Sequence, residues 1–476
     1  MKKLQSISKN LSGLVLVVLC TALLSACCHC KIQKSIITQW CSQPYSEFPS
    51  DSSIILWRKP GVSHEAFERW KREHHLPTGQ AICTFCGDDD LELYNGVNIE
   101  LLGGTGGTTT CTTGTICKPH GGGDDVAEFC YNIPIKIDTA QGGKYDTVDS
   151  SLIPSQDGIT GPVVDIAVFD TGIDPAIAAK YTRALARPCN PSAALGWDFA
   201  NGDNTTNDDF VTKHGSRVAK FIIDQVQIYH NQRVNIIPVK IFDANGNTSL
   251  FKVLCAFAYA QHSGIKIINA SFGFYWHDLH NPPALFCDYI KTHLTDHGIL
   301  LIASAGNRDL EEDAAVITSG LVSSGDIRNL KKHPCYPAAL AGRPGYENVV
   351  TVTTVFSRQD KVSPQQNYSK ALVDIGTDGI ERCTVQDVPD PTEEYCFKDP
   401  LEPVLTATPI SGSSFAAPII TGRITAFYDI LTAGMGSSMN KATLIARMQS
   451  KNLVATSTGT VIPSHIKGGV YAPKAP

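Results

Sequence analysis

Short apolar runs recur between residues 163 and 355 and predict strands. Each is rich in β-branched residues and apolar on both faces, which is typical of strands buried inside a parallel sheet. They cover 163–169, 234–242, 265–272, 299–303 and 349–355. Stretches with helical spacing separate several of them, at 216–228, 250–262 and 284–297. This alternation predicts an α/β fold with a doubly wound, mostly parallel sheet, in a domain that we place at 155–435.

A smaller unit is predicted ahead of this sheet, at 51–100. Residues 54–57 have the composition of a strand, 63–76 carry two aromatic residues on one helical face, and 91–94 alternate like a strand. The pattern predicts a small α+β unit, and a purely structural or binding role for it stays open.

Gly and Thr dominate the start of the next segment, 101–154. This composition favours a flexible linker region, and no Gly-Lys-Ser/Thr sequence follows that would indicate a phosphate-binding loop. Such a linker is the natural place for cleavage between the two halves. At the other end of the chain, residues 436–476 are predicted to form a C-terminal tail.

The composition is that of an ordinary globular protein with room for one large domain and additions. The chain has 476 residues, of which 42% are hydrophobic and 18% charged, and its formal net charge is −6. An acidic chain without long blocks of Lys and Arg is not expected to have nucleic acid as its main partner. Its sixteen cysteines indicate an oxidising compartment.

The N-terminus agrees with export. Lysines precede an apolar run at 11–24, which has the length of a signal-peptide core and is short for a membrane-spanning helix. The run ends in Leu24-Ser25-Ala26-Cys27, which resembles the lipobox of bacterial lipoproteins. The resemblance implies a signal peptide at 1–26, lipidation at Cys27, a tether at 27–50, and an outer-membrane or cell-surface location, since Cys28 and not Asp follows. An ordinary secretory signal cut nearby is the alternative.

Two groups of cysteines carry predictions. Cys83 and Cys86 have the spacing of half a zinc site, but Cys111, Cys117 and Cys130 follow irregularly, so a disulfide is favoured in an exported protein. Cys383 and Cys396 bracket an acidic, proline-bearing loop and are predicted to pair with each other.

Polar residues with a neighbouring Gly stand where three of the predicted strands end. In open α/β sheets, ligands bind beyond the carboxyl ends of the strands, and Gly lets the backbone approach a ligand closely. The three sequences are Asp170-Thr171-Gly172, Asn269-Ala270-Ser271-Phe272-Gly273 and Ser304-Ala305-Gly306-Asn307. Each alone is compatible with ordinary turn chemistry, whereas together they predict a cleft.

A candidate base and a candidate nucleophile complete the set. His214 precedes an amphipathic helix, and Ser414, in Gly412-Ser413-Ser414, opens an apolar one. A lone His or Ser at such a position is usually a capping or surface residue. Here they follow a strand-end Asp in the order Asp, His, Ser.

These blocks resemble the signatures of subtilisin-like serine proteases (the subtilase family), over roughly residues 160–435. The resemblance implies a subtilisin-like fold, a propeptide-like role for the unit at 51–100, and serine endopeptidase activity through an Asp-His-Ser triad. It assigns the triad to Asp170, His214 and Ser414, and an oxyanion-binding amide to Asn307. It also implies that the substrate peptide lies along Ser271, Phe272, Gly273, Ala305 and Gly306.

The remaining expectations concern ligands and partners. The family chemistry requires no cofactor, and calcium is a candidate ligand because acidic loops in the family often bind it; a solvated loop is the alternative here, for Asp198, Asp203, Asp208 and Asp209. We expect protein or peptide substrates, membrane association through Cys27, no nucleic acid, and a monomer. Residues 308–334 and 379–405 have the character of insertions.

Two other functions are alternatives to a serine protease. A non-catalytic surface-binding protein on the same scaffold is disfavoured because all four chemical positions are filled. An esterase with a nucleophile elbow is disfavoured because Gly-x-Ser-x-Gly does not fit around Ser414 and the triad order is wrong for that fold.

Overall fold

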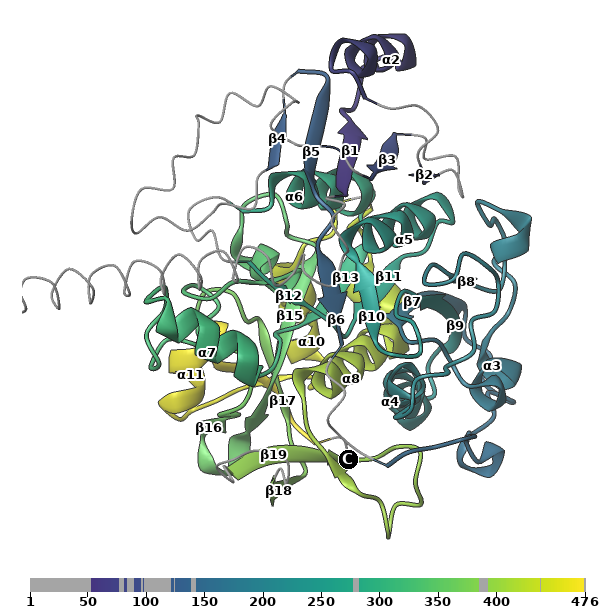
Figure 1. The fold of residues 1–476 in the computed structure, drawn as a ribbon. Helices are drawn as coiled ribbons and strands as arrows, with labels where there is room; N and C mark the ends of the chain where they lie inside the picture. The colour runs from purple at the N-terminus through teal and green to yellow at the C-terminus, as the bar shows by residue number, and fades with distance from the viewer. Residues whose placement is uncertain are drawn as a thin grey trace, which may run out of the picture.

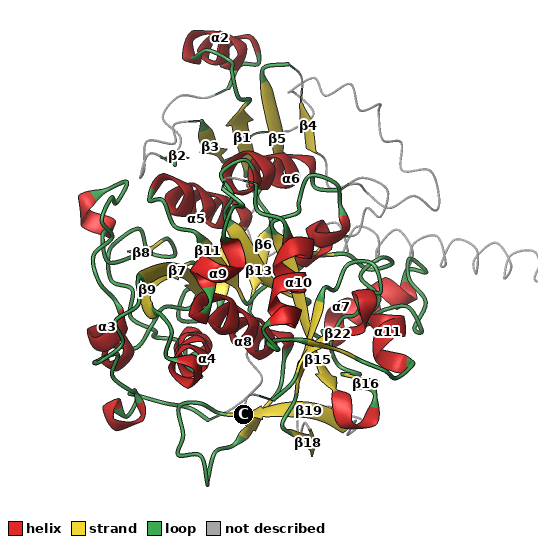
Figure 2. Ribbon diagram, turned by 180° about the vertical axis from the view of Figure 1, so that it is seen from behind, coloured by secondary structure: helices red, strands yellow, loops and turns green. Residues whose placement is uncertain are grey.

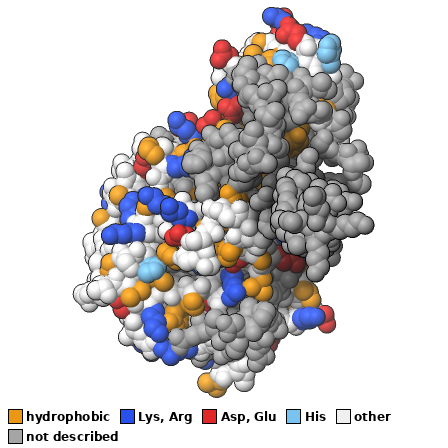
Figure 3. All heavy atoms as spheres, turned by 60° about the vertical axis from the view of Figure 1, so that its left-hand side comes forward, with side chains coloured by type: hydrophobic (Ala, Val, Ile, Leu, Met, Phe, Trp, Pro, Cys, Tyr) orange, Lys and Arg blue, Asp and Glu red, His pale blue; other side chains and the backbone are white. Residues whose placement is uncertain are grey.

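The computed structural model describes most of the chain from residue 53 onward. The described ranges are 53–76, 81–83, 90–95, 97, 121–123, 125–137, 143–276, 282–384, 393–436 and 438–474. A small sheet with one helix lies at one end of a larger α/β body (Figure 1). Basic, acidic and apolar side chains are interspersed over the face drawn in Figure 3.

The large body is built on a ten-stranded sheet in the order β21-β22-β17-β15-β13-β11-β7-β9-β8, with β16 beside β15. All neighbouring pairs from β22 to β8 are parallel, and only β21 and β16 run antiparallel to their partners. The strands are β7 (Val163–Asp170), β8 (Trp197–Asp198), β9 (Arg233–Lys240), β11 (Ile267–Ala270), β13 (Leu300–Ser304), β15 (Val349–Phe356), β16 (Lys361–Val362), β17 (Ile375–Asp378), β21 (Ala455–Thr456) and β22 (Val470–Ala472). The predicted mostly parallel α/β sheet is confirmed.

Helices cover both faces because successive side chains of a strand point to opposite sides. On β7, Val164, Ile166 and Val168 join one core cluster with helices α4 (His214–Tyr229) and α8 (Ser413–Ala426). Ala167 and Phe169 join the opposite cluster with α5 (Leu250–His262) and α6 (Ala284–Ile290). Figure 2 shows α4 and α8 in front of the sheet in the reversed view.

The remaining elements surround this core. They are helices α3 (Pro175–Tyr181), α7 (Leu310–Thr318), α9 (Tyr428–Thr432), α10 (Lys441–Ser450) and α11 (Val461–His465), and strands β10 (Asn247–Ser249), β12 (Phe274–Tyr275), β14 (Cys335–Tyr336), β18 (Glu381–Thr384), β19 (Glu393–Lys398) and β20 (Pro409–Ile410). The predicted insertions therefore contain α7 and the β18–β19 hairpin. Within the described residues, no helix is both long and apolar enough to cross a membrane.

The small sheet has the order β2-β3-β1-β5-β4. Its strands are β1 (Ile54–Arg58), β2 (Ala81–Ile82), β3 (Leu91–Tyr94), β4 (Gly121–Gly123) and β5 (Ala127–Tyr131), and its helix is α2 (His64–Glu73). Because β5 pairs with β1 along its whole length, the unit extends to about residue 131, past the predicted boundary at 100. We call residues 53–131 the N-terminal unit.

Two further segments, predicted as a linker and a C-terminal tail, contain strands that pair with the large body. After the N-terminal unit, β6 (Pro134–Lys136) pairs antiparallel with β10 of the large body, so this part of 101–154 is no free linker. The segment predicted as a C-terminal tail supplies β21, β22 and α10, whose Leu444 and Met448 are fully buried. Residues 436–476 therefore complete the sheet and core of the large body.

Candidate active site

Asp170 and His214 meet at the carboxyl end of the central sheet. Asp170 is the last residue of β7, and His214 is the first residue of α4, preceded by Lys213 in a left-handed conformation with φ of 53°. Nδ1 of His214 lies 2.7 Å from Oδ1 of Asp170, and both side chains are buried. Such a contact holds the imidazole ring through Nδ1 and leaves Nε2 available to a third group.

A third carboxyl, Asp208, joins the segments that carry these two residues. Its Oδ1 accepts from the Thr171 hydroxyl at 2.9 Å, and its Oδ2 accepts from the amide and hydroxyl of Ser216 at 2.9 and 2.7 Å. Burial, with a smaller contribution from the charge of Asp170, raises the pKa of Asp208 to about 6. No sequence motif marks this role, and Asp208 was considered only as a candidate calcium ligand.

The two segments approach so closely that Gly215 is required between them. A Cβ at Gly215 would lie 2.2 Å from the carbonyl oxygen of Gly172 and 3.1 Å from Cβ of Asp170. The Gly215 amide instead donates to the Thr171 hydroxyl at 2.9 Å. The glycine that follows His214 is thus required for packing as well as being part of the sequence motif.

Ser414 lies in the first turn of α8. Gly412 precedes the helix with φ of +134°, a conformation that favours glycine. The ring of Phe415, the next residue, lies 5.4 Å from the ring of His214, which places His214 beside this turn. The hydroxyl of Ser414 donates to the Ser271 carbonyl at 3.0 Å, and across the described part of the chain it makes no hydrogen bond to His214.

Asn307 faces the same helix start. Its Oδ1 accepts from the amide and hydroxyl of Ser413 at 2.9 and 3.1 Å. Its Nδ2 would lie 3.4 Å from a Cβ at Gly412, and no other described residue hydrogen-bonds to that nitrogen. The amide is therefore held by its oxygen with its two N–H donors available.

The predicted substrate-binding residues flank the turn that carries Ser414. Ser271 donates to the Ser414 carbonyl at 2.8 Å, and the Gly306 amide donates to the Ser413 hydroxyl at 3.0 Å. Phe272 and Ala305 are buried next to them. All five residues thus follow β11 or β13, and the two segments lie on either side of α8's first turn.

Cys335 lies between these two segments and was missed by the sequence reasoning. A Cβ at Gly273 or Gly306 would lie 2.5 or 2.9 Å from its sulfur. The thiol is free, and burial raises its pKa to about 12, so it is a neutral packing group. The closeness of both glycines to one sulfur is a tertiary feature with no signal in the local sequence.

The four acidic residues considered for calcium do not converge. Asp209 pairs with Lys240, Asp198 accepts from the Asn201 amide at 2.9 Å, and Asp203 accepts from the Thr205 amide at 2.7 Å. Among the described residues, no three His, Cys, Asp or Glu side chains cluster as a metal site. Calcium therefore stays a prediction, and Cys27, the predicted lipidation site, lies outside the described residues.

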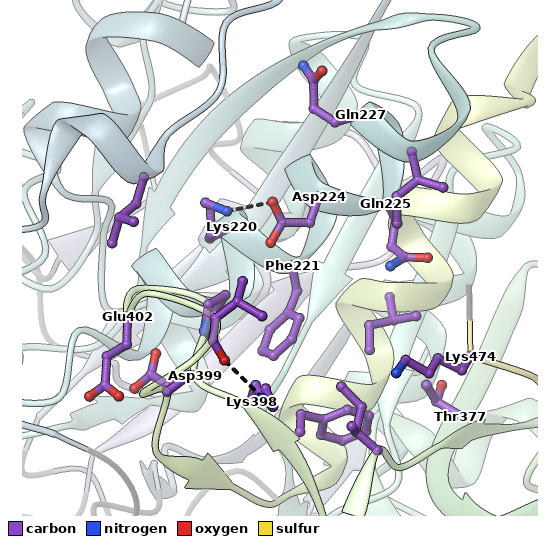
Figure 4. Close-up of a pocket in the computed structure, with 18 of the residues that line it drawn as sticks. Lys220, Phe221, Asp224, Gln225, Gln227, Thr377, Lys398, Asp399, Glu402 and Lys474 are labelled. Atoms are coloured by element: carbon purple, nitrogen blue, oxygen red, sulfur yellow. Dashed lines mark hydrogen bonds and ion pairs between the residues drawn. The ribbon is translucent and has the colours of Figure 1, made fainter. Parts of the chain in front are cut away.

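A hollow of about 890 Å³ lies away from this site, along α4. Phe221, Ile419 and Phe397 supply apolar surface, and the Lys220–Asp224 ion pair lies at its edge (Figure 4). Neither Asp170, His214 nor Ser414 lines it.

Comparison with known proteins identifies the large body. A model of the subtilase family matches residues 161–460. The chain is 29% identical to a cell wall-associated protease of Bacillus subtilis (strain 168) over 157 residues, which are 31% of this chain and 16% of that protein. It is 25% identical to a thermophilic serine proteinase of Bacillus sp. (strain AK1) over 224 residues, 46% of this chain and 44% of that protein. The chain thus spans less than half the length of either relative.

Two solved structures also match the chain, both with low TM-scores. The crystal structure of a lanthipeptide protease matches with a TM-score of 0.44 and 20% identity, covering 65% of this chain and 86% of that one. The epidermin leader peptide processing serine protease from Staphylococcus aureus matches with a TM-score of 0.49 and 14% identity, covering 89% and 96%.

Proposed function

The chain belongs to the subtilase family, and on this basis we propose that it is a serine endopeptidase. The observation that carries the proposal is the 2.7 Å contact of His214 with Asp170, made beside the helix turn that presents Ser414. These are the parts of a nucleophile, its base and the group that orients the base.

In the proposed reaction, Ser414 attacks the carbonyl carbon of the scissile peptide bond. The attack requires the Ser414 hydroxyl to turn from the Ser271 carbonyl toward Nε2 of His214, a rotation about one side-chain bond. His214 accepts the hydroxyl proton and returns it to the leaving amine, while Asp170 holds the imidazole and stabilises its charged form. Water then hydrolyses the acyl-enzyme ester by the same route in reverse.

Negative charge that develops on the carbonyl oxygen would be bound by two donors. Nδ2 of Asn307 is available because its oxygen is held by Ser413, and the Ser414 amide lies in the first turn of α8. A helix start is electropositive, and donors fixed before the reaction need no reorganisation.

We propose peptides in extended conformation as substrates. The segments at 271–273 and 305–306 flank Ser414 and offer backbone groups to an added strand. Export and a lipid anchor at Cys27 belong to the same proposal, supported by the apolar run at 11–24 and the Leu24-Ser25-Ala26-Cys27 sequence. Mass spectrometry of the mature N-terminus tests the anchor, and an unmodified start away from Cys27 would rule it out.

A fluorophosphonate probe tests the activity directly, because it reacts only with an activated serine. We expect the folded, fully processed protein to be labelled at Ser414, and the Ser414→Ala and His214→Ala variants to remain unlabelled. Absence of labelling in the wild type would support the alternative, a surface-binding protein without catalysis.

A further inference from the structure

The N-terminal unit presents two different faces. On β1, Ile54 and Leu56 pack against α2, in a cluster that includes Phe67. Ile55 and Trp57 point the other way and join the core cluster of α5 and α6. The strand alternation therefore makes one face of the unit its own core and the other face part of the large body.

The contact with the large body is apolar and well defined. The ring of Trp57 meets the ring of Tyr289 edge-on, with centroids 5.4 Å apart. Leu91 of β3 and Cys130 of β5 are buried in the same cluster. Figures 1 and 2 both show α5 and α6 between the small sheet and the central sheet.

A disulfide crosses this contact. Cys83 and Cys255 are joined, with their Cα atoms 5.8 Å apart and a sequence separation of 172. Cys83 is held in place because its amide donates to the Leu91 carbonyl at 2.9 Å, and Cys255 lies in the middle of α5. Both sulfur-bearing residues are buried, at 5% and 6% exposure.

The polypeptide provides a second connection at a different place. After β5, the side-chain oxygen of Asn132 accepts from the Phe251 amide at 3.0 Å, and the Ile133 carbonyl accepts from the Leu250 amide at 2.9 Å. The chain then continues through β6 on the edge of β10. Among the described residues, the N-terminal unit is thus joined to the large body by the backbone and, through Cys83 and Cys255, by a disulfide.

We propose that the Cys83–Cys255 disulfide makes the N-terminal unit a permanent part of the protein after any cut in the connecting polypeptide. A propeptide held only by surface contacts is lost once it dissociates. Here a cut leaves two chains covalently linked, so the unit stays at high effective concentration beside α5 and α6 and binds again. The covalent link remains whether the protein is cut by itself or by another protease.

The Cys83–Cys255 bond can form by exchange with the disulfide of an oxidoreductase. The two thiols lose two protons and two electrons as the S–S bond forms, and the disulfide of an oxidoreductase takes both electrons and is reduced to a dithiol. In the reverse direction, a dithiol such as dithiothreitol supplies two electrons and returns Cys83 and Cys255 to thiols. Only then does the cut unit become free to leave.

The test uses the full chain carrying Ser414→Ala, so that self-digestion plays no part. Limited trypsin treatment cuts after exposed residues such as Lys144, between the unit and β7. In denaturant without reductant, we expect the fragment that contains Cys83 to migrate with the fragment that contains Cys255. Dithiothreitol should separate the two completely.

Variants and a peptide map complete the design. Because Cys189 is also disulfide-bonded, Cys255→Ser is made together with Cys189→Ser. The double variant should let the fragments separate without reductant, whereas Cys189→Ser alone and Cys383→Ser, which removes the distant Cys383–Cys396 bond, should not. If the double variant does not fold, the disulfide map of the unreduced Ser414→Ala protein decides, with a linked Cys83–Cys255 peptide pair as the expected result. Alkylation of Cys83 in that unreduced protein, or its linkage to another cysteine, would overturn the proposal. Fluorophosphonate labelling of the wild type is independent of this result, so failure of the proposed activity would be seen separately.

Discussion

At the scale of single residues, the position of His214 depends on a carboxyl that does not touch it. Asp208 binds Thr171, next to Asp170, and Ser216, two residues after His214. It therefore holds β7's end and α4's start together at the point where Gly215 allows them to meet. In this position the Asp208 carboxyl is buried away from solvent, and this burial raises its pKa.

The raised pKa of Asp208 predicts that stability falls as pH rises from about 4 to about 6. Over this range the folded state holds a proton that the unfolded state, with a pKa near 3.8, has released. The free energy of unfolding should fall by about 3 kcal/mol, and Asp208→Asn should remove this slope. Urea unfolding of Ser414→Ala protein at several pH values measures it.

The control for this measurement is Asp429→Asn, since Asp429 is exposed on α9. That variant should keep the slope of its parent. Equal slopes with and without Asp208→Asn would show that Asp208 is ionised throughout.

Asn307 carries the second prediction at this scale. Asn307→Ala removes the amide nitrogen that is free for the oxyanion but leaves the His214–Asp170 contact untouched. Turnover of a fluorogenic peptide should fall by about two to three orders of magnitude, the size measured for this donor in subtilisin, with a smaller change in KM. Unchanged turnover would remove Asn307 from the proposed mechanism.

At the scale of elements, α4 is tied to the insertion that contains β18 and β19. Arg217, three residues after His214, has a fully buried side chain. Its Nε and Nη2 donate to Oδ2 of Asp399 at 2.9 and 2.6 Å, and Nη2 also donates to the Gly143 carbonyl at 3.0 Å. The local sequence does not reveal this pair, because Asp399 lies 182 positions away from Arg217.

Breaking this buried pair should be strongly destabilising. Arg217→Met leaves Asp399 charged and without its cation, which costs about 3–5 kcal/mol of unfolding free energy. The double variant Arg217→Met/Asp399→Leu should recover most of this loss, because no unpaired charge remains. Urea unfolding in the Ser414→Ala background measures both.

The exposed pair of Arg69 and Glu65 is the matched control for that series. Its partners lie 3.5 Å apart on the surface of α2, so Arg69→Met should cost less than about 1 kcal/mol. If the single Arg217 variant were as mild, the pair would add little to the fold.

At the scale of the whole molecule, the sequence predicted what depends on local pattern. The five apolar runs became β7, β9, β11, β13 and β15, and 216–228 and 250–262 correspond to α4 and α5 with small shifts. The predicted helix 284–297 is divided into α6 and a π-helical turn, Lys291–Thr295. The strand ends then placed Asp170 and Asn307 at one edge of the sheet. The Cys383–Cys396 pair was also predicted, because its two cysteines bracket one short acidic loop, and the structure places them on the paired strands β18 and β19.

What the sequence did not reveal depends on contacts between distant segments. Val470–Ala472 is too short to show a period, and it becomes a strand only because β17 offers an edge. Gly121–Gly123 has no side chains to show alternation, and it pairs with β5 after a Gly- and Thr-rich segment. The Cys83–Cys255 bond needed the N-terminal unit to be seated on α5 before it could be recognised.

The seated unit buries one carboxyl that bears on the stability of the whole molecule. Glu128 stands opposite Trp57 on the face that meets α6, and burial, together with the charge of Asp288 on α6, raises its pKa. Lys59, 3.3 Å away, lowers it in part, and Oε2 of Glu128 has no hydrogen-bond partner among the described residues. Ionisation of Glu128 therefore places a poorly solvated negative charge beside that of Asp288.

Glu128→Gln should therefore stabilise the contact at neutral pH. The glutamine is neutral, and its amide can donate to the Asp288 carboxylate, which the ionised glutamate repels. Because the pKa of Glu128 is raised, the wild-type contact weakens as pH rises through that pKa, and this weakening should be absent from the variant.

Hydrogen exchange of the β5 amides in Ser414→Ala protein, measured at pH 5 and pH 8, reports the opening of the unit. The variant should show slower exchange than its parent at pH 8 and a smaller difference at pH 5, after correction for intrinsic rates. Glu65→Gln on the exposed surface of α2 should leave both values unchanged, and equal exchange of the Glu128 variant and its parent at pH 8 would mean that Lys59 already neutralises this carboxyl.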